Sequence, residues 1–357
     1  MDDHDVGGDS ARLRYLDHEG AIVKPLPGAL ANRDLLIRLY RAMTLTRTFD
    51  AKIIALQRTG QIGTYASTLG QEAIGVGLGS AMRREDLLLP AYRDTAAQLL
   101  RGVTLCEQLL YWGGDERGSD FAGPREDFPI CVPVGSQYCH AVGVATAFQL
   151  RHQPRVAVVT GGDGSTSKGD FYEALNLAGA WRLPVVFVIN NNGWAISVPL
   201  ERQSGTTTLA DKAKAGGFPG VRVDGNDVIA VHAVVGEALD RARAGDGPTL
   251  VEALSYRLGD HTTADDAGRY RDPDEVSRHW AEDPLVRLRN YLVTGHGWRK
   301  DDEESLLEEC SATIEAAVAE YQAIPPAAPE AMFEHLYETL PLALVAQRDD
   351  LARRLRR

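Results

Sequence analysis

The sequence contains few cysteines, no long apolar run and a shortage of basic residues. The four cysteines, Cys106, Cys131, Cys139 and Cys310, lack the paired spacing of a zinc site, and so small a number among 357 residues favours a reducing compartment. No apolar run approaches the roughly 18 residues that a membrane-spanning helix needs. With 38 Lys and Arg against 50 Asp and Glu, the net charge is −12, which argues against a nucleic-acid-binding protein with a basic face.

The start of the chain and its composition predict a cytoplasmic globular protein. The first residues, MDDHDVGGDS, are acidic and polar, unlike a secretory signal or a transit peptide. A hydrophobic share of 44% with 25% charged residues is typical of soluble domains. Strand-like apolar runs recur, so we expect one α/β domain over residues 31–325. Residues 1–30, with Pro25 and Pro27, should form a flexible N-terminal arm, and residues 326–357 a C-terminal helical tail that is solvated or faces a partner.

The most informative stretch runs over residues 155–199. An apolar run at 156–159 leads into the turn Gly162-Asp163-Gly164, and a second run at 185–189 leads into Asn190-Asn191-Asn192. The segment between them carries apolar residues at helical spacing. Strand, helix, strand is the pattern of a parallel βαβ unit, which places the carboxyl ends of both strands on one edge of a sheet.

Two oxygen-bearing side chains follow these strands at the spacing of such a unit. Asp163 and Asn192 lie 192 − 163 = 29 residues apart, and a βαβ unit takes about 30 residues. A carboxylate and an amide oxygen are hard ligands that suit Mg²⁺, which fills its remaining positions with water and phosphate oxygens. The flanking glycines allow close backbone approach, and the following helix start favours an anion. The pattern therefore predicts a metal-bridged diphosphate site.

Two other interpretations of this stretch are open. A dinucleotide-binding fingerprint, and with it an oxidoreductase, would need Gly or Ala at Ser167, and Asp163 would repel a bare pyrophosphate. An ordinary turn followed by a polar loop is the simpler interpretation of Gly-Asp-Gly alone, but it does not account for the asparagines at the βαβ distance.

The segments GDGSTSKGDFYEALN and VFVINNNGWAIS resemble the thiamine diphosphate motif of the 2-oxo acid dehydrogenase complexes. The resemblance is to the alpha subunit of their first, decarboxylating component, and it extends from about Leu35 to the C-terminus. It implies the thiamine diphosphate-binding fold, a parallel sheet with helices on both faces. It also implies Mg²⁺ ligated by Asp163, Asn192 and the backbone carbonyl of Trp194, beside cofactor-binding positions at Gly162, Gly164 and Ser165.

The same resemblance implies roles for residues elsewhere in the chain. Tyr92 and Arg93 would bind the diphosphate, and backbone groups at Val132 and Val134 would meet the aminopyrimidine ring. His261 would reach the diphosphate and the catalytic centre, and Tyr65 would lie nearest the 2-oxo acid. Several pyruvate enzymes have histidine where this chain has Ala66.

The resemblance further implies a multi-chain enzyme. No Glu motif is found that would act on the aminopyrimidine nitrogen, and in two-chain relatives the beta subunit supplies it. We therefore expect an α2β2 heterotetramer, inactive without its beta chain, that decarboxylates a 2-oxo acid and passes the acyl group to a lipoyl domain of the acyltransferase. Pyruvate is favoured because GQEA and VGSQ resemble the pyruvate branch; branched-chain 2-oxo acids come second and acetoin third. A non-catalytic assembly subunit is the remaining alternative, opposed by Asp163, Asn192, Arg93 and His261.

Overall fold

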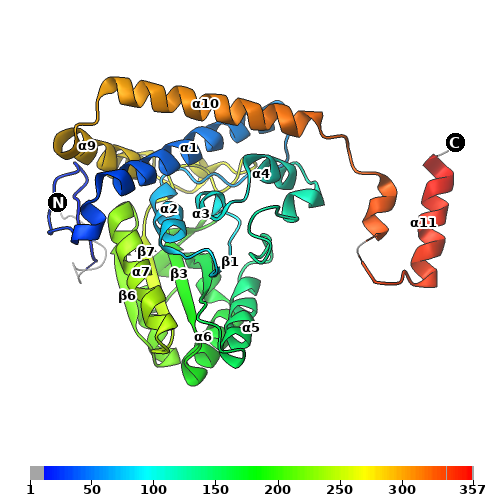
Figure 1. Ribbon diagram of the computed structural model, residues 1–357, viewed down its shortest axis with the longest axis horizontal. Helices are drawn as coiled ribbons and strands as arrows, with labels where there is room; N and C mark the ends of the chain where they lie inside the picture. The colour runs from blue at the N-terminus through cyan, green and yellow to red at the C-terminus, as the bar shows by residue number, and fades with distance from the viewer. Residues whose placement is uncertain (1–11, 335, 356–357) are drawn as a thin grey trace.

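A five-stranded parallel sheet forms the centre of the molecule (Figure 1). The computed structural model describes residues 12–334 and 336–355. The strand order is β1-β2-β3-β7-β6, and every neighbouring pair is parallel. The strands are β1 (Leu87–Leu89), β2 (Ala157–Gly162), β3 (Val185–Asn191), β7 (Thr249–Leu254) and β6 (Gly220–Asp224).

Both faces of the sheet are covered by helices, as predicted. Alternate strand residues point to opposite faces, so Val158, Val186 and Val251 enter one apolar core while Val159 and Phe187 enter the other. The first core is completed by α1 (Arg33–Arg58), α2 (Glu72–Ala81) and α7 (Val228–Arg243), and the second by α5 (Ser136–Leu150) and α6 (Gly169–Trp181).

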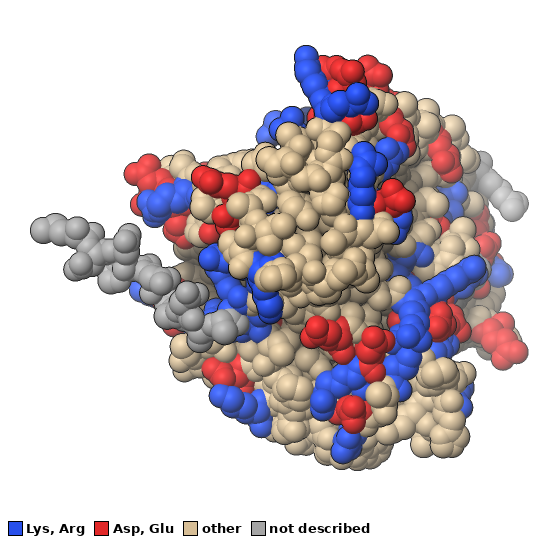
Figure 2. Space-filling view, turned by 60° about the vertical axis from the view of Figure 1, so that its left-hand side comes forward, with Lys and Arg blue, Asp and Glu red and all other residues tan. Residues whose placement is uncertain are grey.

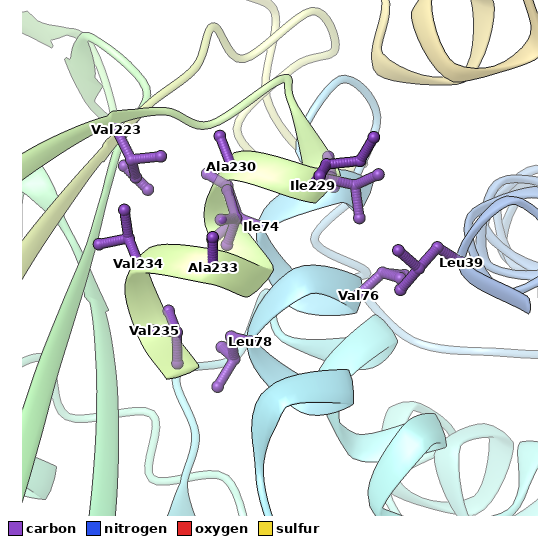
Figure 3. Packing of buried hydrophobic residues seen from close by; sticks show 14 of the residues in the cluster. Leu39, Ile74, Val76, Leu78, Val223, Ile229, Ala230, Ala233, Val234 and Val235 are labelled. Atoms are coloured by element: carbon purple, nitrogen blue, oxygen red, sulfur yellow. The ribbon is translucent and has the colours of Figure 1, made fainter. Parts of the chain in front are cut away.

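Helix α2 lies between α7 and α1 (Figure 3). The α2 side chains Ile74, Val76 and Leu78 fill the space between α2 and these two helices. Glycines allow α2 to pack closely on two helices: a Cβ at Gly77 would lie 2.7 Å from the Val231 side chain of α7, and one at Gly75 would lie 2.8 Å from Ala96 Cβ in the helix at residues 95–101. Any larger residue at these positions would force the helices apart.

Local sequence signals set the helix limits. Asn32 caps α1 by accepting hydrogen bonds from the Asp34 and Leu35 amides, as its position predicts. Asp227 caps α7 in the same way. The other α-helices are α3 (Thr95–Arg101), α4 (Leu105–Trp112), α8 (Pro273–His279), α9 (Pro284–His296), α10 (Lys300–Ala323) and α11 (Leu342–Leu355).

The C-terminal region is helical, and α11 stands apart from the sheet and its helices (Figure 1). None of the described α11 side chains is buried, and Leu342 is 88% exposed. On the face shown in Figure 2, acidic and basic side chains are interspersed. Within the described residues, no helix is both long and apolar enough to span a membrane.

The expectation of a flexible arm over residues 1–30 does not describe residues 12–30. The amides of Tyr15 and Leu16 donate to the Asp227 carboxylate at 2.7 and 2.9 Å, and Leu13 bridges Val223 beside the edge strand β6. Tyr15 and Leu16 are buried, because the carboxylate satisfies their backbone and the first core receives their side chains. Residues 1–11 lie outside the described part.

Candidate active site

The carboxyl ends of four adjacent strands meet at one cavity of about 580 Å³. Gly162 at the end of β2 is in register with Asn190 of β3, so Asp163 and Asn192 both emerge just past the sheet. The segment after β1 brings Arg93, and the loop after β7 brings His261. Ligand sites of open α/β sheets occur at this edge.

The cavity gathers eleven of the predicted site residues. They are Tyr92, Arg93, Val132, Val134, Gly162, Asp163, Gly164, Ser165, Asn192, Trp194 and His261. The side chains of Val132 and Val134 are 61% and 44% exposed, which places them at the cavity mouth. These residues come from segments far apart in the sequence, and the structure brings them together. Their individual roles remain predictions.

The three consecutive asparagines divide between the two sides of β3. Asn190 and Asn192 line the cavity, whereas Asn191 points the other way and donates to Glu252 Oε1 at 2.8 Å. This alternation follows from the period of two in a strand. Asn192 Oδ1 accepts from the Trp194 amide at 3.1 Å, which bends the chain into the short hairpin of β4 (Trp194–Ala195) and β5 (Val198–Pro199).

Asp163 is a buried carboxylate that faces the cavity. It is 1% exposed, and burial raises the pKa of its carboxyl above the usual value. Its Oδ2 accepts from Gln203 Nε2 at 2.8 Å. Within the described part of the chain it forms no ion pair, so its negative charge is compensated by hydrogen bonds and by the more distant Arg257. A buried carboxylate without an ion-pair partner is stabilised by a bound cation.

Two arginines place positive charge around His261: Arg93 lines the cavity, and Arg257 is buried within 3.4 Å of the His261 ring. Arg93 donates to the carbonyl oxygens of Ser67 and His261, the latter at 2.9 Å. Arg257 is 1% exposed and donates to the carbonyls of Trp194 and Ile196 at 3.3 and 2.7 Å. Because carbonyls are neutral, the Arg93 guanidinium remains available to an anion such as a diphosphate in the cavity. Arg257 also donates to the Tyr270 hydroxyl at 2.8 Å and contributes positive charge from its buried position.

His261 lies between these arginines in its neutral form. Burial, then Arg93 and Arg257, lower the pKa of its imidazole to about 4. The guanidinium groups of Arg93 and Arg257 each lie 3.4 Å from Nδ1. Arginine can only donate, so Nδ1 accepts and the neutral ring carries its proton on Nε2. Asp265 holds the loop by accepting from the His261 amide at 2.9 Å.

Tyr65 does not line the cavity, so the structure does not place its side chain where a substrate contact was expected. The side chain is fully buried in the apolar cluster beneath α1, and its hydroxyl donates to Asp50 Oδ1 at 2.7 Å. Its neighbours Thr64 and Ala66 line the cavity instead. The Tyr65 backbone pairs with Thr263, at 3.0 Å to Oγ1 and 2.8 Å to the amide, and so anchors the His261 loop.

Sequence reasoning missed several polar residues that line the cavity. Gln71, Gln137 and Trp112 each have a buried polar atom without a hydrogen-bond partner: Gln71 Nε2, Gln137 Oε1 and Trp112 Nε1. Asp94 lines it too, and burial raises the pKa of its carboxyl to about 6. Gln71 belongs to the GQEA motif and Gln137 to VGSQ, so the motifs themselves were the available signal. Unpaired buried polar groups in a cavity indicate a polar ligand.

The donor set fits a divalent cation with a phosphate ligand. The described residues contain no group of three or more His, Cys, Asp or Glu side chains that could hold a metal by themselves. An ion at Asp163 would therefore draw its other ligands from amide, carbonyl, phosphate or water oxygens, which is the preference of Mg²⁺. Arg93, which lines the same cavity, would neutralise part of the phosphate charge.

Comparison with known proteins gives the family. The family described as "Dehydrogenase E1 component" matches residues 40–330. The chain is 40% identical over 336 residues to the pyruvate dehydrogenase E1 component subunit alpha of Staphylococcus aureus, covering 94% of this chain and 91% of that one. It is 42% identical over 320 residues to the 3-methyl-2-oxobutanoate dehydrogenase subunit alpha of Mycobacterium tuberculosis, covering 89% and 87%. The chain therefore belongs to the dehydrogenase E1 component family, as its motifs predicted.

Proposed function

We propose that this chain is the alpha subunit of a 2-oxo acid dehydrogenase complex that uses thiamine diphosphate and Mg²⁺, with pyruvate as the favoured substrate. The observation that carries the proposal is the meeting of Asp163, Asn192, Arg93 and His261 around one cavity at the carboxyl edge of the sheet. A carboxylate, an amide and the Arg93 guanidinium line the cavity together, which is the charge arrangement that a metal-bound diphosphate requires.

The residues divide into those that hold the cofactor and those that face the reaction. Asp163, Asn192 and the Trp194 carbonyl would hold Mg²⁺, and Tyr92, Arg93 and the backbone around Gly164 would hold the diphosphate. The bound cofactor supplies the carbanion chemistry of decarboxylation. The neutral His261 ring would donate from Nε2 to a phosphate or to a developing oxyanion, and a bound diphosphate would raise the pKa of its imidazole.

One part of the cavity suits the acyl group of a 2-oxo acid. Thr64, Ala66, Trp112 and Cys131 line it, and all but Trp112 are small. Small side chains leave room for either a methyl or a branched acyl group. The two relatives with those different substrates have similar identities, 40% and 42%, so the preference for pyruvate rests on the GQEA and VGSQ motifs.

The proposal includes partners. The acidic residues that line the cavity are Asp94 and Asp163, so the glutamate required at the aminopyrimidine would come from a beta subunit. The exposed Val132 and Val134 at the cavity mouth would be covered by that subunit in an α2β2 heterotetramer. The acyl group would then pass to a lipoyl domain of the acyltransferase. Residence in the cytoplasm is a further expectation, drawn from composition.

The test is a binding and turnover experiment on the chain assembled with its beta subunit. Calorimetry should detect thiamine diphosphate binding that depends on Mg²⁺, and Asp163→Ala should abolish it. Asp170→Asn, which removes an exposed carboxylate seven residues away, is the matched control and should bind normally. Binding of NAD in place of thiamine diphosphate would favour the dinucleotide alternative.

Turnover then separates the substrates. Acyl transfer to the lipoyl domain should be faster, as kcat/KM, with pyruvate than with 3-methyl-2-oxobutanoate. Acetoin, which has no carboxyl group to release as carbon dioxide, should be a poorer acyl donor than both. A preference for 3-methyl-2-oxobutanoate would overturn the substrate assignment while leaving the reaction class intact. Unchanged thiamine diphosphate affinity in Asp163→Ala would overturn the reaction class itself.

A further inference from the structure

Two glutamines outside the strand-end motif contact the two side chains that are expected to hold the metal. Gln71 precedes α2 and is 3% exposed. Its Oε1 accepts from Asn192 Nδ2 at 3.1 Å and from Asn190 Nδ2 at 2.7 Å. Gln203 lies on the loop after β5, and its Nε2 donates to Asp163 Oδ2 at 2.8 Å. Each glutamine thus reaches one of the two expected ligands.

The contact with Gln71 determines which atom Asn192 presents. An amide has a donor end and an acceptor end, and only its oxygen can ligate a cation. Because Gln71 Oε1 takes up the nitrogen of Asn192, the Asn192 oxygen faces away from Gln71, where it accepts from the Trp194 amide and retains a second lone pair. Asn190 holds the same acceptor, while its own oxygen accepts from Ser255 Oγ at 2.7 Å.

The contact with Gln203 helps to orient the Asp163 carboxylate. Gln203 donates to Oδ2, and the backbone amide of Asn192 also bonds the carboxylate, so both contacts fix the direction in which the carboxylate points. The Val198 carbonyl accepts from the same Gln203 nitrogen at 2.9 Å, which holds the glutamine against the β4–β5 hairpin. A neutral amide donor orients the carboxylate without cancelling its charge, which an arginine or lysine at this position would do.

We propose that Gln71 and Gln203 are positioning residues that set the oxygen ligands of Asn192 and Asp163 for a divalent cation. The inference rests on the proposed function, because it assumes that these two residues ligate the metal. Outer groups that orient metal ligands typically contribute 10- to 100-fold in metal affinity, roughly, when they are removed. The two glutamines act on different ligands from different loops, so each can be tested separately.

The test measures Mn²⁺ affinity by electron paramagnetic resonance, with saturating thiamine diphosphate, on the chain assembled with its beta subunit. Gln71→Leu and Gln203→Leu should each bind Mn²⁺ about 10- to 100-fold more weakly than the unmodified protein. Gln71→Glu keeps an acceptor for both asparagine nitrogens and should recover at least tenfold of the loss. The control Gln108→Leu removes a buried glutamine that bonds Gln98 outside the cavity and should leave Mn²⁺ affinity unchanged.

The outcomes separate this inference from the proposed function. If the unmodified protein binds no Mn²⁺ in the presence of thiamine diphosphate, both are overturned. If it binds Mn²⁺ but both leucine variants stay within twofold of Gln108→Leu, the inference alone is overturned. Gln203 is partly exposed and belongs to neither core, so Gln203→Leu decides the question even where Gln71→Leu does not fold. Equal losses in Gln71→Leu and Gln71→Glu would overturn the assignment of Gln71.

Discussion

Replacing Tyr65 with Phe distinguishes a structural tyrosine from one that contacts the substrate. The Tyr65 hydroxyl donates to Asp50, a buried carboxylate that also accepts from the Ser67 hydroxyl and from the Thr68 amide. Tyr65→Phe removes one of these donors and leaves the ring in place. We therefore expect lower stability with an unchanged KM for the 2-oxo acid.

The size of the effect follows from the bond that is lost. A hydrogen bond to a charged group contributes about 1.5–3 kcal/mol to the free energy of unfolding. With an unfolding entropy of roughly 2.1 cal/mol/K per residue, a chain of 357 residues loses about 1.3 °C in Tm for each kcal/mol. Tyr65→Phe should therefore lower Tm by about 2–4 °C.

Calorimetric melting and steady-state kinetics on the assembled protein provide the two measurements. Tyr291→Phe is the control, because Tyr291 is buried in α9 and no described residue accepts a hydrogen bond from its hydroxyl; its Tm should change by less than 1 °C. A tenfold rise in KM for the 2-oxo acid with an unchanged Tm would refute the placement of Tyr65 and restore it to the substrate site.

Three further predictions concern the cavity. Arg93→Ala should weaken thiamine diphosphate binding by about 10- to 100-fold in calorimetry, because charged hydrogen bonds contribute about 1.5–3 kcal/mol; a change below threefold would contradict its role. Ala66→Val narrows the cavity, so it should lower kcat/KM for 3-methyl-2-oxobutanoate at least tenfold more than for pyruvate, and an equal loss for both would argue against an acyl site there. His261 takes up its proton near pH 4 when folded but near its ordinary pKa of 6.5 when unfolded, so its contribution to stability is present above pH 6.5 and is lost as the pH falls toward 4. His261→Asn should flatten the dependence of Tm on pH over that interval, whereas a curve parallel to that of the unmodified protein would contradict the lowered pKa.

The strands and the central pair of polar residues could be predicted from the sequence. Apolar runs bounded by Gly-Asp-Gly and by asparagines determine where β2 and β3 end, and the βαβ spacing then brings Asp163 and Asn192 to the same edge. Arg93 and His261 lie in loops without periodicity, so only the resemblance to a family singled them out. The structure shows all four at one cavity.

The side on which Tyr65 lies could not be predicted, because neighbouring residues of an extended segment point in opposite directions and the sequence does not say which direction leads to the cavity. Thr64 and Ala66 face the cavity and Tyr65 faces the apolar cluster, an alternation that the sequence contains without revealing which side is which. The answer depends on Asp50, which belongs to α1 and attracts the tyrosine hydroxyl. The resemblance placed the segment before GQEA near the substrate but did not determine which of its side chains faces the cavity.

Contacts between segments far apart in the chain could not be predicted from the sequence either. The Asp227 carboxylate orders Tyr15 and Leu16 from more than 200 positions away, and no local pattern in residues 12–30 signals this. Gln71 and Gln203 meet Asn192 and Asp163 only after the sheet has formed. Only the GQEA motif could have singled out Gln71, and Gln203 has no periodic or compositional signature that would separate it from a surface glutamine.

The carbonyl oxygens that accept from Arg93 and Arg257 are neutral, and this has a consequence for how anions enter the cavity. The whole chain carries a charge of −12, which repels both diphosphates and 2-oxo acids at a distance. At physiological ionic strength that repulsion fades beyond about 8 Å, so an approaching anion feels mainly its immediate surroundings. The Arg93 guanidinium, solvated by backbone oxygens at the cavity, then attracts an entering anion locally in spite of the net negative charge of the chain.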